Sequence, residues 1–177
     1  TITPTELVLS FRDEGIPFQN QKHSVCRYTF NDGQYSYLCT GALINTVNNT
    51  VTPYFLTAAH CISTAQKAST IVAYFNYEEA ACTSVILDPS QTISGSSLLT
   101  TGLPSDYTLL QFNKLIPLSY NPFFAGWDAG DTRPENSVSI HHPGGRAKKI
   151  SVDFDTAEIN REAIPWEGGN ISPSDTH

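Results

Sequence analysis

Residues 54–61 read YFLTAAHC, an apolar run that ends in small residues, a histidine and a cysteine. Aromatic and β-branched residues bounded by turn-forming segments are typical of a short strand. Such a strand would hold the His60 imidazole rigidly at the edge of a core, where a general base could act. A lone histidine is more often structural than catalytic, so the stretch alone predicts a strand and makes His60 a candidate base.

Similar short runs lie on both sides of this stretch. They are residues 36–45 (SYLCTGALIN), 52–57 (TPYFLT), 70–77 (TIVAYFNY) and 107–112 (YTLLQF). Turn signals such as Asp32-Gly33 and residues 47–50 separate them, which predicts an all-β barrel or sandwich. A short helical turn is expected only within residues 58–68.

The composition excludes several classes of protein. A chain of 177 residues fits one domain or two small lobes, and a hydrophobic fraction of 40% makes disorder improbable. The formal net charge of −7 would repel a nucleic acid. No apolar run approaches the roughly 20 residues that span a bilayer, so we expect no membrane partner.

Four cysteines, Cys26, Cys39, Cys61 and Cys82, suggest an oxidising environment. An even number permits three pairings, and no pair has the C-x-x-C spacing of a zinc or redox site. Four buried free thiols in a cytosolic domain are the alternative.

Asp106 directly precedes the apolar run at residues 107–112. Considered alone, it is best explained as a turn residue at the start of a strand. Paired with His60, a buried carboxylate could accept the Nδ1 proton, fix the imidazole tautomer and stabilise the imidazolium.

Several stretches together resemble the trypsin-like serine endopeptidases, and within them the bacterial lysyl endopeptidase family. The general resemblance lies in residues 39–44 (CTGALI), 54–61 (YFLTAAHC) and 105–110 (SDYTLL). The closer one lies in residues 71–77 (IVAYFNY) followed by Cys82, 124–128 (FAGWD), 140–143 (IHHP) and 148–151 (KKIS).

This resemblance implies a trypsin-like double β-barrel. Residues 26–117 would form a complete first barrel, and residues 118–177 an incomplete second one. Residues 1–25 would be an N-terminal arm or the remnant of a pro-segment. The expected protein is secreted, monomeric and independent of metals and cofactors, and it hydrolyses peptide or protein substrates, with Lys or another basic residue before the cleaved bond.

The resemblance also implies roles for individual residues. His60 would be the general base and Asp106 its orienting partner. Disulfides would join Cys39 to Cys61 and Cys26 to Cys82. Trp166 would form a wall of the primary specificity pocket, although an ordinary packing aromatic is an equal alternative.

One departure from the family pattern is severe. No Gly-x-Ser-Gly nucleophile loop occurs in the 177 residues, and Ser94–Ser97 and Ser172 lie in unsuitable contexts. We therefore expect a fragment that stops before this loop, because residues 166–169 (WEGG) and Thr176-His177 resemble family segments upstream of the nucleophile. The missing C-terminal half of the second barrel would then be a partner.

Two rival functions remain open. A non-catalytic protease homologue could serve as an extracellular binding module, although it would have no chemical need for His60 and Asp106. An unrelated adhesive β-sandwich would require the whole series of motifs to be accidental.

Two further groups of residues have simple interpretations. His141 and His142 are adjacent, so on a strand they point to opposite faces, and a structural role before Pro143 is expected rather than a metal site. Arg146, Lys148 and Lys149 are expected to form a solvated basic loop.

Overall fold

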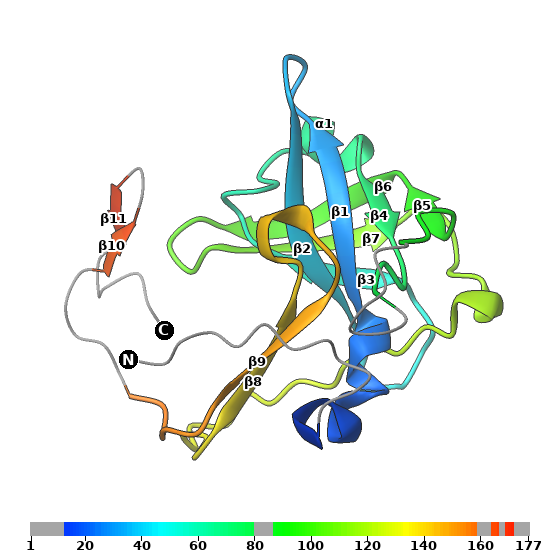
Figure 1. Ribbon diagram of the computed structural model, residues 1–177. Coiled ribbons are helices and arrows are strands. Elements are labelled where there is room, and N and C mark those ends of the chain that lie inside the picture. The colour runs from blue at the N-terminus through cyan, green and yellow to red at the C-terminus, as the bar shows by residue number, and fades with distance from the viewer. Residues whose placement is uncertain (1–12, 80–86, 159–163, 167–168, 172–177) are drawn as a thin grey trace.

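The computed structural model describes residues 13–79, 87–158, 164–166 and 169–171, and most of its regular elements are β-strands (Figure 1). Seven strands form one antiparallel sheet in the order β5-β4-β1-β2-β3-β7-β6. Their bounds are β1 Val25–Asn31, β2 Ser36–Ile44, β3 Tyr54–Thr57, β4 Val72–Tyr74, β5 Thr92–Ser94, β6 Ser96–Gly102 and β7 Tyr107–Phe112.

The remaining elements are short. Two hairpins pair β8 (Ser137–His141) with β9 (Lys149–Asp153) and β10 (Ile164–Trp166) with β11 (Gly169–Ile171). The α-helix is α1 (Ala65–Ser69), and the 3₁₀ helices are η1 (Asp13–Phe18), η2 (Gln21–Ser24), η3 (Leu118–Tyr120) and η4 (Pro143–Gly145). No helix among the described residues is long and apolar enough to cross a membrane.

Gly95 explains how the large sheet curls. It is the single residue between β5 and β6, which are the two edges of that sheet. Its φ of 80° favours glycine, its N–H donates to Ile71 O at 2.8 Å, and its carbonyl accepts from Asn113 N at 3.1 Å. The sheet edges are thereby brought together, and the sheet forms a curled half-barrel.

The inner face of this sheet carries the main core. On β7, Thr108, Leu110 and Phe112 alternate inward, as the period of a strand requires. Leu110 and Phe112 belong to one buried cluster with Phe55 of β3 and Tyr28 of β1, both of which have 0% exposure. Each fully buried large apolar side chain stabilises the fold by about 1.5–3 kcal/mol.

The β8–β9 hairpin has a much smaller core of its own. Among the described apolar side chains of the hairpin, Ile150 and the small Ala147 are buried, and Phe18, Val138, Ile140 and Val152 pack around Ile150. The chain leading to the hairpin touches the first sheet at Ala125, which exchanges backbone hydrogen bonds with Leu43 and Asn45 at 2.9 and 2.8 Å.

The predicted all-β fold is confirmed, and each predicted strand contains an observed one, β7 with the same bounds. The helical turn is confined to α1 because the Thr64 hydroxyl caps it, accepting from Lys67 N at 3.3 Å. The prediction of a solvated basic loop is wrong for Lys148, which is only 1% exposed. Its ammonium is buried because the protein supplies hydrogen-bonding and charged partners, described below.

Candidate active site

His60 follows β3 in a tight turn. The turn is closed by the N–H groups of Cys61 and Ile62, which donate to Ala58 O at 3.3 and 3.2 Å. Ala59 and Cys61 are buried on either side, so the backbone of His60 is anchored. The imidazole itself is exposed, with 71% of its side chain accessible.

Asp106 lies just before β7 and faces this turn. Its Oδ2 lies 2.6 Å from His60 Nδ1, and its Oδ1 accepts from His60 N at 2.8 Å. Its carbonyl accepts from Ala59 N at 3.1 Å, so all three oxygen atoms of Asp106 contact the histidine turn. The side chain is one-third exposed, which corrects the expectation of a buried carboxylate: the described residues only partly cover it.

The backbone of Asp106 has a positive φ of 48°. This left-handed conformation is uncommon outside glycine and costs roughly 1–3 kcal/mol, although aspartate tolerates it better than most residues. The hydrogen bonds to the histidine turn hold the residue in this conformation.

This geometry determines which imidazole nitrogen can accept a proton. An ionised carboxylate only accepts hydrogen bonds, so with neutral His60 the Nδ1 atom carries the proton and donates to Asp106. His60 Nε2 then presents its lone pair, as a general base requires. The structure thus brings together the two residues that the sequence nominated for proton transfer.

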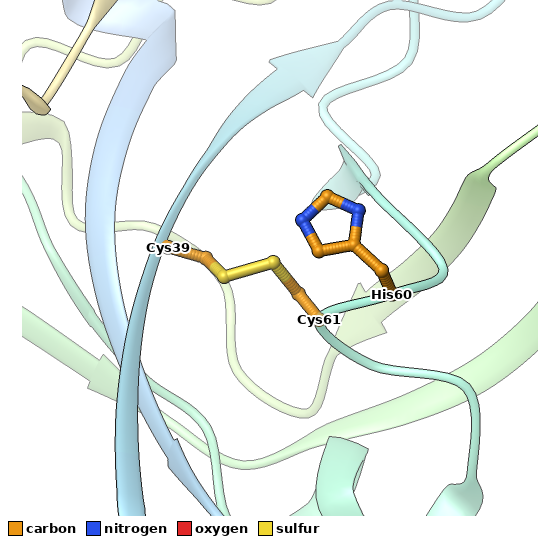
Figure 2. Close-up of side chains that lie close together, drawn as sticks. All are labelled: Cys39, His60 and Cys61. Carbon is orange, nitrogen blue, oxygen red and sulfur yellow. A yellow bond between two sulfur atoms is a disulfide. The ribbon is translucent and has the colours of Figure 1, made fainter. Parts of the chain in front are cut away.

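A disulfide fixes the same turn to the neighbouring strand. Cys39 on β2 is bonded to Cys61, with their Cα atoms 6.7 Å apart, and the bond lies beside the His60 ring (Figure 2). This confirms one of the two predicted disulfides. Donor atoms of Cys39, His60 and Cys61 form the one cluster of potential metal ligands found in the described part of the chain. Because the two sulfurs are bonded to each other, only the imidazole could act as a normal ligand there.

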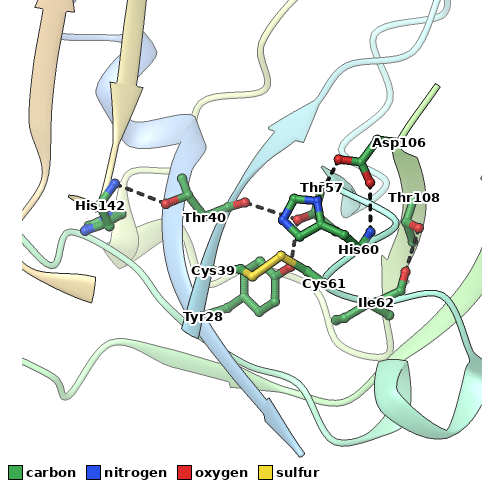
Figure 3. The surroundings of a disulfide bond; sticks show 10 residues. All are labelled: Tyr28, Cys39, Thr40, Thr57, His60, Cys61, Ile62, Asp106, Thr108 and His142. Atoms are coloured by element: carbon green, nitrogen blue, oxygen red, sulfur yellow. Dashed lines mark hydrogen bonds and ion pairs between the residues drawn. A yellow bond between two sulfur atoms is a disulfide. The ribbon is translucent and has the colours of Figure 1, made fainter. Parts of the chain in front are cut away.

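Hydrogen bonds of buried hydroxyl groups link the strands on both sides of the His60 turn (Figure 3). Thr57 Oγ1 donates to Thr40 O at 3.1 Å and accepts from Tyr28 OH at 2.7 Å, which links β1, β2 and β3. Burial raises the pKa of Tyr28, so the phenol remains a donor. Thr108 Oγ1 similarly donates to Ile62 O at 2.6 Å. The sequence analysis missed these residues, because single polar residues on apolar strands do not reveal which partners they will meet.

An open groove of about 360 Å³ lies next to Asp106. Its lining is mainly apolar and comes from the first sheet and β8: Val25, Thr40, Gly41, Ala42, Leu56, Thr57, Ala58, Asp106, Tyr107 and Ile140. Leu56 and Tyr107 remain 40% and 39% exposed. The groove is therefore an uncovered apolar surface beside the His60–Asp106 pair.

His142 has a structural position close to this region. Its N–H donates to Thr40 Oγ1 at 3.0 Å, and its Nδ1 donates to Arg146 O at 2.9 Å. Burial lowers the pKa of this imidazole to about 4, so the ring is neutral at pH 7.

Other nominated residues remain untested. Cys26 is a buried free thiol whose pKa burial raises to about 12, and its proposed partner Cys82 lies outside the described residues. The Cys26–Cys82 disulfide therefore stays a prediction. Trp166 pairs with Gly169 in the β10–β11 hairpin, and its side chain lies outside the description.

Comparison with known proteins identifies relatives in both sequence and structure. The family model "Lysyl endopeptidase, C-terminal domain" matches residues 10–170. The chain is 30% identical over 142 residues to a lysyl endopeptidase of Pseudomonas aeruginosa. The match covers 76% of this chain and 30% of that protein, so the chain spans less than a third of that relative's length.

Solved structures share the fold at lower identity. The thermostable serine protease AL20 from an extremophilic microorganism superposes with a TM-score of 0.61 at 14% identity, over 86% of this chain and 76% of the other. An inactivated protease paralogue of the scabies mite gives a TM-score of 0.54 at 19% identity, over 75% of this chain and 61% of the other. Because active and inactivated proteins share this architecture, the trypsin-like fold alone does not determine activity.

Proposed function

The chain belongs to the lysyl endopeptidase family of serine proteases, and on this premise we propose that His60 and Asp106 are its catalytic base and orienting acid in peptide-bond hydrolysis. The observation that carries the proposal is the 2.6 Å contact between His60 Nδ1 and Asp106 Oδ2. This contact leaves Nε2 as the basic atom of the imidazole. Because the ring is exposed, a substrate can reach Nε2.

The proposed reaction proceeds through an acyl-enzyme. A serine hydroxyl attacks the scissile carbonyl while His60 Nε2 takes its proton, and the resulting imidazolium gives that proton to the leaving amine. A water molecule then attacks the ester, with His60 again accepting and returning a proton. Asp106 stays ionised throughout and stabilises the imidazolium that forms in each half of the reaction.

We propose that the serine lies in a segment of a longer protein outside these 177 residues. None of the 177 residues belongs to a Gly-x-Ser-Gly motif, and the chain spans 30% of its curated relative's length. The apolar groove beside Asp106 supports this proposal, because it is a surface that a further part of the second lobe could cover. A segment that covered the groove would also shield Asp106, whose side chain is one-third exposed, from water.

The proposed substrate class follows from the family name. Lysyl endopeptidases are named for cleavage after lysine, and we propose that this protein cleaves after lysine or another basic residue, with Trp166 as a candidate wall of the pocket that accepts that residue. A secreted location is proposed from the Cys39–Cys61 disulfide together with the lysyl endopeptidase relative. We also propose that the functional protein is a monomer.

An organophosphorus fluoride that modifies activated serines tests the proposed function. We expect it to label a longer chain that includes the downstream Gly-x-Ser-Gly segment, and to leave the 177-residue chain unmodified. The matched control is the longer chain with His60→Ala, which keeps the serine but removes the base and should label far more slowly.

Either of two results would overturn the proposal. Labelling of the 177-residue chain would reveal a nucleophile inside it, and Ser97→Ala and Ser172→Ala variants would identify that residue. A longer chain that is folded but neither labels nor hydrolyses a lysyl peptide ester would be a non-catalytic homologue.

A further inference from the structure

Lys148 is a buried cation outside the candidate active site. Its side chain is 0% exposed, and its Nζ donates to the main-chain carbonyl of Lys22 at 2.7 Å. Glu78 Oε2 lies 3.7 Å from the same nitrogen. Its backbone N–H donates to Tyr77 O at 3.1 Å, so Lys148 is fixed both to Lys22 and to the first lobe, by which we mean the seven-stranded sheet and its connections, residues 25–112. A buried charge is tolerated only with such compensation, which makes this placement specific.

Glu78 connects Lys148 to the N-terminal segment a second time. Its Oε1 accepts from Lys22 Nζ at 2.9 Å, so one carboxylate serves two ammonium groups. Burial by itself raises the pKa of Glu78, but Lys148 and Lys22 outweigh it and the pKa is lowered overall. Lys22 thus meets this cluster through both its carbonyl and its side chain.

The same N-terminal segment makes three further contacts. Phe18 packs on the Ile150 core of the β8–β9 hairpin. His23 Nδ1 lies 2.8 Å from Asn76 Oδ1, which follows β4, and His23 O accepts from Phe123 N at 3.5 Å. Residues 18–24 therefore contact the first lobe, the connecting chain and the hairpin at once.

We propose that residues 18–24 form an interlobe strap, and that Lys148 is the positioning residue through which the strap holds the β8–β9 hairpin against the first lobe. Lys148 directly precedes β9, so its fixed ammonium sets the start of that strand. The hairpin contributes few buried apolar side chains of its own, and these polar contacts provide much of its attachment.

The strap has a consequence for the candidate active site, which rests on the proposed function. β8 supplies Ile140 to the groove beside Asp106, and His142 just after it donates to Thr40 next to Cys39. A loosened hairpin would displace this wall of the groove. Hydrolysis should then slow without any change in His60 or Asp106.

Amide hydrogen exchange on the 177-residue chain tests the strap independently of any activity. We expect Lys148→Met to accelerate exchange of the β8–β9 amides by at least about tenfold and to leave those of β3 and β7 unchanged. Arg146→Met is the matched control, because Arg146 is a basic residue of the same hairpin that is exposed. It should change exchange in the hairpin by less than about twofold.

Glu78→Gln should loosen the hairpin in the same way, and it provides a second variant should Lys148→Met fail to fold. The double variant should loosen the hairpin by less than the sum of the two single variants, because both substitutions remove the shared Lys148–Glu78 contact. The strap is refuted if the β8–β9 amides keep their wild-type protection in both single variants, or if exchange accelerates equally in β3 and β7. In the longer chain, the variants should also lower kcat/KM; an inactive wild type would refute the proposed hydrolysis while leaving the exchange result intact.

Discussion

The seven-stranded sheet and the β8–β9 hairpin are stabilised in different ways. The sheet curls around large apolar side chains, whereas the described apolar residues that the β8–β9 hairpin buries are Ile150 and the small Ala147. The first lobe can therefore present the His60–Asp106 pair already formed. The hairpin depends instead on polar contacts with segments far away in sequence, above all those of Lys148 and Lys22.

The sharpest difference between the lobes should appear in catalysis by the longer chain. Asp106→Asn should lower kcat by roughly 10⁴-fold, because the amide favours the wrong imidazole tautomer and cannot stabilise the imidazolium. Asp131→Asn changes an exposed carboxylate outside the first lobe and should leave kcat unchanged. Equal kcat values for Asp106→Asn and wild type, measured with a lysyl peptide ester, would break the assignment of chemistry to the first lobe.

Core substitutions should separate the lobes in stability. Phe55→Ala should lower the free energy of unfolding of the whole chain by about 3–5 kcal/mol, because it leaves a cavity at the centre of the main core. Ile150→Ala should cost about 2 kcal/mol and loosen mainly the hairpin, where half-exposed neighbours can collapse inward. Urea unfolding measures the loss of stability in Phe55→Ala, and amide exchange shows which part of the molecule Ile150→Ala loosens. If Ile150→Ala lowered the protection of amides from exchange equally in the seven-stranded sheet and in the hairpin, the proposed difference in their stabilisation would be wrong.

Acid should weaken the region around His142. The unfolded imidazole binds a proton below its ordinary pKa of 6.5, whereas the buried one stays neutral down to about 4. The unfolded state therefore holds more protons in this window, and the free energy of unfolding should fall as the pH drops from 6.5 to 4, by at most about 3 kcal/mol. His142→Gln should flatten this part of the profile. An unchanged slope in that variant would show that other groups cause it.

The smallest predicted effect concerns α1 in the first lobe. Thr64→Ala removes the hydroxyl that accepts from Lys67 N and should lower the free energy of unfolding by about 1 kcal/mol. The adjacent Ser63→Ala is the control and should cost less than about 0.5 kcal/mol. Denaturation midpoints at constant m-value measure both, and equal losses would exclude a specific capping role.

The sequence was most informative where structure depends on local pattern. A short apolar run bounded by turn residues predicted β7 with its observed bounds, and the family resemblance implied the Cys39–Cys61 disulfide and the pairing of His60 with Asp106. These features depend on strand periodicity and on short segments whose chemistry is recognisable.

Long-range polar contacts could not be predicted in this way. Lys148 lies in a run of basic residues that resembles a solvated loop, and its burial depends on Glu78 and Lys22, which are distant in sequence. The hydroxyl contacts of Tyr28, Thr40 and Thr57 are equally non-local. Asp106 is more exposed than expected, because its cover depends on surfaces that the described residues do not provide.

A crystal structure of the longer chain with its serine modified by an organophosphorus reagent would test most directly whether the first lobe supplies a preformed catalytic pair. We expect the 2.6 Å contact between His60 Nδ1 and Asp106 Oδ2 to persist. His60 Nε2 should lie within about 3.2 Å of the modified serine oxygen. A broken His60–Asp106 contact, or an imidazole whose Nε2 faces away from that oxygen, would contradict the proposed mechanism.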